Sequence, residues 1–215
     1  MKPIRAIIFD LDGVIVSSDH FHYLGWKALA DELEMAFDEE RNHALRGVSR
    51  MESLEILLGG RTADFSDSEK LALAERKNGI YRGLLDALGP QHLLPGVADF
   101  LAACRKKELM LAIGSSSKNG RFILEKIGLA RAFDSVVDGS DITRSKPDPE
   151  VFLKAAAEMG CPASACLVVE DAEAGVAAAV AAGMDCLAVG AAAGDPRAAY
   201  SATDLSTAQL PFLPL

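Results

Sequence analysis

Long apolar runs are missing from this sequence of 215 residues. None reaches the roughly 18 or more residues that a helix needs to cross a membrane. The chain passes from Met1, Lys2 and Pro3 directly into a strand-like run, without the apolar stretch and cleavage site of a signal peptide. We therefore expect a cytoplasmic protein with no membrane partner, and we expect it to be a monomer.

Cysteine is scarce, since the chain has only four, and no two of them form a C-x-x-C pair. Three of them lie within or beside apolar runs, where a reduced thiol behaves as a small hydrophobic side chain. The sequence therefore indicates neither a disulfide framework nor a zinc site. The four are Cys104, Cys161, Cys166 and Cys186.

Positive charge is also in short supply, because 22 lysines and arginines face 31 acidic residues and the net charge is -9. This balance disfavours nucleic acid and anionic membranes as partners. A phosphorylated substrate would have to be captured by local basic groups against the overall field. The lysines and arginines close to a candidate site are therefore the residues that best indicate whether it binds a phosphorylated substrate.

The segment around which the chain is organised covers residues 5–14 and reads R-A-I-I-F-D-L-D-G-V. Its apolar part, 6–9, is too short for a helix and stops at Asp10, Asp12 and Gly13. A continuous apolar run is typical of a strand covered on both faces of a parallel α/β sheet. Ligands of such sheets bind beyond the carboxyl ends of the strands, so the two aspartates mark the predicted active site. The alternative is a solvated loop that happens to hold two acids.

A helical insertion of about 80 residues follows, since the strand pattern disappears after Gly13. Ser49 is placed to cap one helix, and Ser66 with Glu69 forms a capping box for a longer one. Lys77 and Asn78 lie near the apolar side of that longer helix, and the pattern leaves open whether Asn78 is structural or contacts a ligand. The expected helices cover 19–33, 38–45 and 49–58, with the longest starting after Ser66.

Strands and helices alternate from Leu94 onward, which predicts an α/β fold. One strand leads into S-S-S-K-N-G, where Ser115 and the backbone could bind phosphate or form an ordinary turn. Another ends at Glu170 and Asp171, and Lys146 lies just ahead of a helix. The expected strands are 110–113, 134–137, 166–169 and 185–189, and the helices are 97–108, 119–127, 149–159 and an alanine-rich one after Asp171.

Two of the predicted strands thus end in paired carboxylates. Four acids at one edge of a sheet would repel one another unless a cation bound them. Mg2+ prefers a few carboxylates together with water and phosphate oxygens. With a serine and a lysine nearby, the set suits phosphoryl transfer, in which an aspartate can serve as the nucleophile. We therefore predict a Mg2+ site at this edge.

The four segments D-L-D-G-V, Ser115, S-K-P-D-P and V-E-D resemble the ordered motifs of the haloacid dehalogenase superfamily, and the resemblance spans the whole chain. It implies an α/β fold with a Rossmann-like, doubly wound parallel sheet as its core, and an inserted helical cap domain that closes over this core. The core would comprise 1–15 and 94–215, and the cap 16–93.

The segments H-F-H-Y-L-G-W-K-A-L-A, L-R-G-V-S-R, E-R-K-N and S-S-S-K-N-G are similar to those of superfamily members that interconvert β-glucose 1-phosphate and glucose 6-phosphate. The resemblance implies that Asp10 is the phosphorylated nucleophile and Asp12 the general acid and base. Ser115 and Lys146 would bind the transferring phosphoryl group. Asp10, the backbone carbonyl of Asp12, Glu170 and Asp171 would hold Mg2+.

The same resemblance assigns the remaining substrate contacts. Arg50, Lys118 and Asn119 would clamp the second phosphate of a sugar phosphate. The residues expected to face the sugar or the acid-base group are Ser18, His22, Trp26, Gly47, Lys77 and Asn78.

Some positions depart from the family pattern. Val16 and Ser17 replace polar residues, Ser18 stands where threonine is typical, and Ala172 where serine is frequent. These changes concern the hinge and rate rather than the reaction type. Two alternatives stay open, a Mg2+-dependent sugar-phosphate phosphatase and a non-catalytic regulator that binds sugar phosphate. The intact Asp10 and Asp12 speak against the regulator, and a dehalogenase would need neither Mg2+ nor the acid at Asp12.

Overall fold

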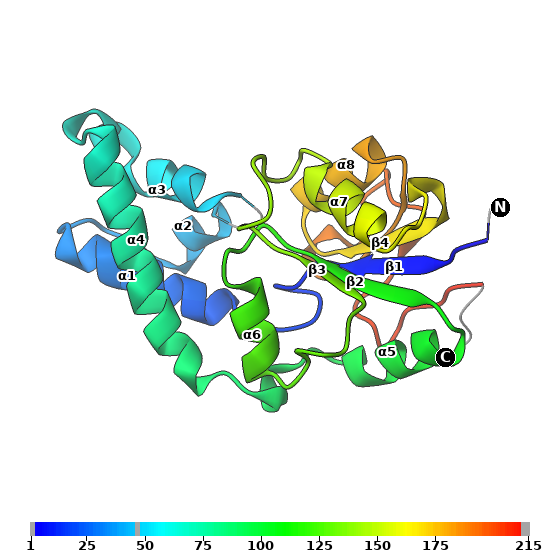
Figure 1. Cartoon of the computed structure of the whole chain (residues 1–215). Helices are drawn as coiled ribbons and strands as arrows, with labels where there is room; N and C mark the ends of the chain where they lie inside the picture. Colours follow the sequence, from blue (N-terminus) through cyan, green and yellow to red (C-terminus); the bar gives the residue numbers. More distant parts are fainter. Residues whose placement is uncertain (1–2, 46–47, 212–215) are drawn as a thin grey trace.

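A computed structural model describes residues 3–45 and 48–211, and within them six strands form one parallel sheet in the order β3-β2-β1-β4-β5-β6. The strand that carries the first motif, β1, lies inside the sheet between β2 and β4 (Figure 1). The carboxyl ends of β1, β2 and β4 therefore meet at one edge. The strands are β1 (Ala6–Phe9), β2 (Met110–Gly114), β3 (Ser135–Val137), β4 (Cys166–Glu170), β5 (Asp185–Ala188) and β6 (Tyr200–Ser201).

Helices cover both faces of the sheet, which confirms the predicted doubly wound architecture. Ile7 and Phe9 of β1 are fully buried against α5 and α6, whereas Ala6 and Ile8 pack toward α7 and α8 on the other face. Successive side chains of a strand point to opposite faces, so an uninterrupted apolar run is what such a strand requires. The helices are α5 (Val97–Lys106), α6 (Gly120–Lys126), α7 (Glu150–Glu158) and α8 (Glu173–Ala181).

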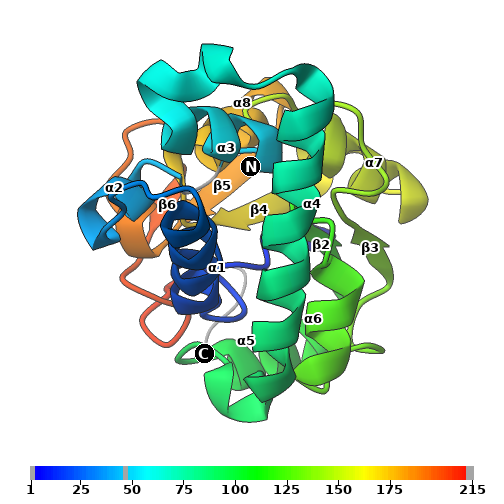
Figure 2. The ribbon, with the colours of Figure 1, turned by 90° about the vertical axis from the view of Figure 1, so that its left-hand side faces the viewer.

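The helices between β1 and α5 form a separate layer beyond the carboxyl edge of the sheet (Figure 2). They are α1 (Asp19–Glu32), α2 (Glu39–His43), α3 (Arg50–Leu58) and α4 (Asp67–Leu84). Ser49 accepts a hydrogen bond from the Glu52 N–H at 3.2 Å, and Ser66 with Glu69 forms the predicted capping box. This layer has an apolar cluster of its own around Trp26, Leu29, Leu54 and Leu57.

Two extended segments join this layer to the sheet, and they run side by side. Ser17 N–H donates to the His92 carbonyl at 3.2 Å, and Leu94 N–H donates to the Ile15 carbonyl at 3.1 Å. The division into a core of 1–15 and 94–215 and a cap of 16–93 stays a prediction, and this paired crossing lies at its expected boundaries.

Two details differ from the sequence-based expectation. Strand β6 has only two residues, which is too short to leave a periodic pattern. On α4 the buried side chain is Lys77 rather than Asn78, which is half-buried.

Short 3-10 turns lie at Gly59–Asp64, Leu85–Ala87, Pro90–His92, Ala163–Ala165 and Gly190–Ala192. In the described parts of the chain no helix combines the length and apolar character needed to span a membrane.

Candidate active site

Asp10 follows β1 and Glu170 ends β4, and Lys146, from the segment between β3 and α7, lies between these two acids. Lys146 Nζ donates to Asp10 Oδ1 and to Glu170 Oε1, each at 2.5 Å, and all three side chains are almost fully buried. Burial acts to lower the pKa of Lys146, but the charges of Asp10 and Glu170 outweigh it and raise that pKa. Lys146 therefore stays charged between the two carboxylates.

Glu170 has both carboxylate oxygens occupied within this arrangement. Its Oε2 accepts from the backbone N–H groups of Asp171 and Ala172 at 2.9 and 3.0 Å, in addition to the contact of Oε1 with Lys146. The carboxylate lies against α8, where a Cβ at Gly175 would fall 1.9 Å from the Glu170 carboxyl carbon. Only glycine fits at that position, so the helix approaches the acid closely.

Lys146 corrects one step of the sequence argument. We expected four converging acids to need a metal ion, whereas a buried ammonium already neutralises part of the charge. Among the residues that the structure describes, no group of three or more His, Cys, Asp or Glu side chains forms a ready-made metal cage. The spacing of the motifs could not predict this, because Lys146 lies 136 residues from Asp10 along the chain.

The negative charges of the acids at this edge of the sheet are only partly neutralised by Lys146. Burial, followed by the charge of Glu170, raises the pKa of Asp171 to about 7. Burial also raises the pKa of Asp10 well above its usual value, although Lys146 opposes this, and burial raises the pKa of Asp12. A further cation would relieve this cost, and carboxylate oxygens are donors that suit a hard cation such as Mg2+. Asp171 lies over Gly13, where a Cβ would fall 2.0 Å from Asp171 Oδ2.

The loop after β2 adds hydroxyl and amide groups to the same edge. Ser115 is buried, its N–H donates to the Val137 carbonyl at 3.0 Å, and its Oγ accepts from Ser117 N–H at 3.1 Å. Asn119 is also buried, whereas Lys118 is exposed. The structure thus places Ser115 and Asn119 at the carboxyl edge and leaves the Lys118 side chain free to reach a ligand from solvent.

The helical layer contributes a buried amine above the sheet edge. Lys77 Nζ lies 3.0 Å from His22 Nδ1, 4.6 Å from the centre of the Trp26 ring and 4.7 Å from that of Tyr81. Burial, followed by the charge of Arg50, lowers the pKa of Lys77 to about 7. Burial together with Lys77 and Arg50 lowers the pKa of His22 well below its usual value, so the imidazole is neutral. Ser18 donates to Asp12 Oδ1, which ties the start of α1 to the first motif.

One side-chain carbonyl joins the two layers. Asn78 Oδ1 accepts from Arg50 Nη2 of α3 and from Asn119 Nδ2 of the loop after β2, both at 3.0 Å. Arg50 Nη1 also pairs with Glu75 at 2.8 Å. The family resemblance implies that Arg50, Lys118 and Asn119 clamp one phosphate, and the structure brings Arg50 and Asn119 onto a common partner.

Gly47, expected to face the sugar, lies outside the described residues. Tyr81 was missed, although it is almost fully buried and its ring lies 4.1 Å from that of His22. Its hydroxyl has no hydrogen-bond partner within the described part of the chain. Its place four residues after Lys77 on the same helix face was the signal that could have included it.

Comparison with known proteins identifies the class. The family of haloacid dehalogenase-like hydrolases matches residues 4–183, and the chain belongs to this family. Beta-phosphoglucomutase of Bacillus subtilis is 40% identical over 194 residues, which cover 89% of this chain and 85% of that protein. The crystal structure of beta-phosphoglucomutase from Clostridium difficile superposes with a TM-score of 0.89 at 34% identity, covering 94% of this chain and 92% of the other.

Phosphatases also appear among the relatives. Fructose-1-phosphate phosphatase YqaB of Escherichia coli is 31% identical over 181 residues, which cover 84% of this chain and 93% of that protein. The family and the fold are therefore shown, and the choice between mutase and sugar phosphatase depends on the site.

The buried amine predicts a pH-dependent stability. The folded pKa of Lys77, about 7, lies below its ordinary value of 10.5, so between these values the unfolded chain binds a proton that the folded chain lacks. The free energy of unfolding should therefore rise with pH above about 7. Replacing Lys77 with Met removes this dependence, so the wild type should gain about 2 kcal/mol relative to Lys77→Met between about pH 7 and 9. Denaturant unfolding at several pH values measures it.

The exposed Lys107→Met provides the matched control and should keep the wild-type slope. An unchanged slope in Lys77→Met would mean that this amine is protonated in the folded protein.

Proposed function

We propose that the protein is a β-phosphoglucomutase that interconverts β-D-glucose 1-phosphate and D-glucose 6-phosphate. The reaction would pass through an aspartyl phosphate on Asp10 and through β-glucose 1,6-bisphosphate. Sugar phosphates would be its partners and Mg2+ its cofactor. The 40% identity to the Bacillus subtilis enzyme supports this proposal.

The observation that carries the proposal is the shared contact at Asn78. A mutase must rebind its bisphosphate intermediate in either orientation, so it needs a second phosphate site that is distinct from the nucleophile. Arg50 and Asn119 donate to the same oxygen, at 3.0 Å each, from opposite sides of the junction between the helical layer and the sheet. Both groups are donors, and a phosphate in place of the Asn78 oxygen would accept from both.

The first phosphate would lie at Asp10. The carboxylate of Asp10 attacks phosphorus, Lys146 neutralises the phosphoryl oxygens, and Ser115 donates a hydrogen bond to them. Asp12 gives a proton to the departing sugar oxygen and takes it back in the reverse step. Closure of the residues 16–93 as a cap would exclude water, so that the aspartyl phosphate passes to sugar rather than to solvent.

Mg2+ would be held by Asp10, the carbonyl of Asp12 and Asp171. The family pattern implies Glu170 as a further ligand, and its oxygens, which here accept from Lys146 and from two backbone N–H groups, would then have to share these contacts with the ion. When bound, the ion supplies positive charge that stabilises the transferring phosphoryl group. The raised pKa of Asp171, about 7, fits a carboxylate that a cation would complement.

Asp171→Asn should therefore weaken Mg2+ binding by at least about tenfold, because it removes one of the charged ligands. Titration calorimetry of Mg2+ into the protein without substrate measures this separately from activity. Asp185→Asn, at the exposed start of β5, is the control and should bind as the wild type does. Equal affinities in all three proteins would remove Asp171 from the metal site.

A sugar-phosphate phosphatase is the second candidate, because the fructose-1-phosphate phosphatase of Escherichia coli is 31% identical to this chain. Such an enzyme has no obligatory second phosphate, and it only needs water to reach the aspartyl phosphate. The two candidates therefore assign different roles to Arg50: a mutase needs it to bind the second phosphate, whereas a phosphatase does not require that contact.

Arg50→Ala should lower kcat/KM for formation of glucose 6-phosphate by roughly tenfold to hundredfold, because it removes a charged, two-pronged phosphate donor. Slow release of free phosphate should survive. Arg50→Lys should recover only part of the loss, since an ammonium keeps the charge without the fork. Both products are measured in one reaction with β-glucose 1-phosphate, Mg2+ and a trace of bisphosphate.

The control is Arg76→Ala, an exposed arginine of α4 that pairs with Glu32. The phosphatase replaces the mutase if the wild type releases phosphate as fast as it isomerises, or if Arg50→Ala lowers both activities equally. A wild type that binds these sugar phosphates but forms neither product would favour the non-catalytic regulator.

A further inference from the structure

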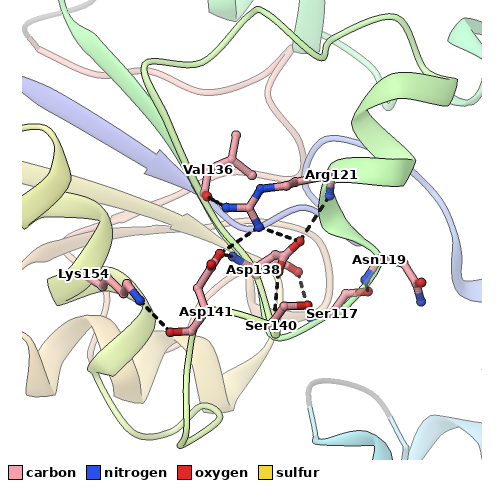
Figure 3. Close-up of polar contacts among 9 residues, drawn as sticks. Ser117, Asn119, Arg121, Val136, Asp138, Ser140, Asp141 and Lys154 are labelled. Carbon is pink, nitrogen blue, oxygen red and sulfur yellow. Dashed lines mark hydrogen bonds and ion pairs between the residues drawn. The ribbon is translucent and has the colours of Figure 1, made fainter. Parts of the chain in front are cut away.

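Two loops at the carboxyl edge of the sheet are bound to one another behind the candidate site. The first, 115–119, follows β2, and the second, 138–141, follows β3. Asp138 begins the second loop (Figure 3). Its side chain is 3% exposed. It plays no part in the chemistry proposed above, yet it is among the few buried acids of the protein.

The Asp138 carboxylate is fully engaged. Its Oδ1 accepts from Ser140 N–H at 2.9 Å, and its Oδ2 accepts from the backbone N–H of Arg121 at 3.4 Å and pairs with Arg121 Nη1 at 3.1 Å. The same Nη1 donates to Asp141 at 2.8 Å, and Nη2 donates to the Val136 carbonyl at 2.7 Å. Arg121 therefore holds the end of β3 and the loop after it against the start of α6.

The backbones of the two loops touch with little space to adjust. Gly139 N–H donates to the Ser117 carbonyl at 2.9 Å, and a Cβ at Gly139 would fall 2.3 Å from the Ser116 carbonyl oxygen. A Cβ at Gly120 would fall 2.9 Å from the Asp138 Cβ. A shift of Asp138 is therefore transmitted directly to the residues that flank Asn119.

Asn119 occupies the N-cap position of α6, but its side chain does not cap the helix. An asparagine at this position usually accepts a hydrogen bond from the second or third N–H of the helix. Here the second N–H, that of Arg121, finds its acceptor in Asp138, while Asn119 Nδ2 donates to Asn78 across the junction. Asp138, from the loop after β3, thus supplies the acceptor for the second N–H of α6.

We propose that Asp138 is a positioning residue: it caps α6 in place of the Asn119 side-chain oxygen, so that the Asn119 side chain is not turned back onto the helix and its Nδ2 can reach the second phosphate. Arg121 fixes Asp138 in this role. The assignment of that phosphate to Asn119 rests on the proposed mutase function. Asp138 itself touches no substrate group and acts through Asn119.

The chain contains a matched control at the other end of β3. Asp134 precedes this strand and accepts from a backbone N–H and from an arginine, Leu111 N and Arg105 Nη1, both at 2.7 Å, whereas Asp138 accepts from two backbone N–H groups and an arginine. Asp134→Asn therefore removes comparable contacts far from the carboxyl edge. Asp138→Asn should raise the KM for glucose 1,6-bisphosphate roughly tenfold, whereas Asp134→Asn should change it by less than about twofold.

Hydrolysis of p-nitrophenyl phosphate, which has no second phosphate, separates positioning of Asn119 from general damage. Its rate should stay within about threefold of wild type in both variants, since it depends on Asp10 and not on Asn119. A double-mutant cycle adds the sharper test. In an Asn119→Ala background, Asp138→Asn should raise the KM by less than about twofold further, because residues that act through one another are not additive. Fully multiplicative effects would overturn the proposal.

A second pair of variants covers the case in which Asp138→Asn fails to fold. Arg121→Gln and Arg105→Gln change two exposed arginines that each bind an aspartate and a backbone carbonyl. Only Arg121→Gln should raise the KM for the bisphosphate. Equal effects of the two, with equal thermal unfolding, would mean that the network is merely structural.

The role of Asp138 can be tested separately from the proposed mutase activity. The Asp10→Asn protein does not transfer the phosphoryl group, so calorimetry measures its affinity for glucose 1,6-bisphosphate without turnover. If the wild type forms no glucose 6-phosphate, the mutase proposal fails, and the affinity of the Asp10→Asn protein with and without Asp138→Asn still reports on Asp138. A bisphosphate affinity that neither Asp138→Asn nor Arg121→Gln alters would overturn the inference.

Discussion

Asp10→Asn is expected to abolish turnover, lowering kcat by roughly 10,000-fold or more, because an amide cannot attack phosphorus while it occupies the same volume. No covalent phosphate should form on the variant. The measurements are glucose 6-phosphate formation and the mass of the protein after mixing with bisphosphate and Mg2+, which should increase by one phosphate in the wild type alone.

The fold should survive this change. Lys146 keeps its contact with Glu170 at 2.5 Å, and an asparagine oxygen can still accept from Lys146. Burial is the main cause of the raised pKa of Asp10, and repulsion from Glu170 and Asp171 adds to it; removing one negative charge relieves that repulsion. Thermal unfolding close to that of the wild type is therefore expected, and Asp185→Asn serves as the active control. Retention of more than a few per cent of activity would argue against a covalent mechanism.

Most helices and strands could be predicted because the signals that define them, apolar runs and helix caps, lie within each element's own sequence. The apolar run of β1 is continuous and the strand is buried on both faces, and Ser49, Ser66 and Glu69 lie where helices begin. Strand β6 escaped detection because two residues carry no periodicity and pair with the sheet only through tertiary contacts with β5.

The site could be predicted only where it depends on strand ends. Glu170 ends β4, Asp10, Asp12 and Asp171 come just after strands, and parallel strands bring their ends to one edge. The position of Lys146 between two acids and the link from Asn78 to Asn119 depend on long-range packing, with separations of 136 and 41 residues. Neither a hydrophobic periodicity nor a helix-capping motif in the sequence predicts these long-range contacts. The apolar pattern of the long helix drew attention to Lys77 beside Asn78, whereas the role of Arg50 was given by the family resemblance.

Asp12→Ala is expected to slow transfer to and from the sugar hydroxyl by about a hundredfold to ten-thousandfold, the usual contribution of a positioned proton donor and acceptor. Burial raises the pKa of Asp12, and the hydrogen bond from Ser18 opposes this rise. A carboxyl group with a raised pKa holds a proton closer to neutral pH, as a general acid must. Formation of the phosphoenzyme from acetyl phosphate, which has a good leaving group, should be affected much less.

Mg2+ binding tests the division of roles between the two aspartates. Only the backbone carbonyl of Asp12 is assigned to the metal, and alanine keeps that carbonyl. The backbone there is held independently of the side chain, since Gly13 N–H donates to the Val16 carbonyl at 2.9 Å and Asp12 pairs with Val16 in a short bridge. Asp12→Ala should therefore lower sugar transfer by at least about a hundredfold while calorimetry finds Mg2+ affinity within about threefold of wild type. A loss of Mg2+ binding as large as the loss of activity would place the Asp12 side chain in the metal site and leave the acid-base role without a residue.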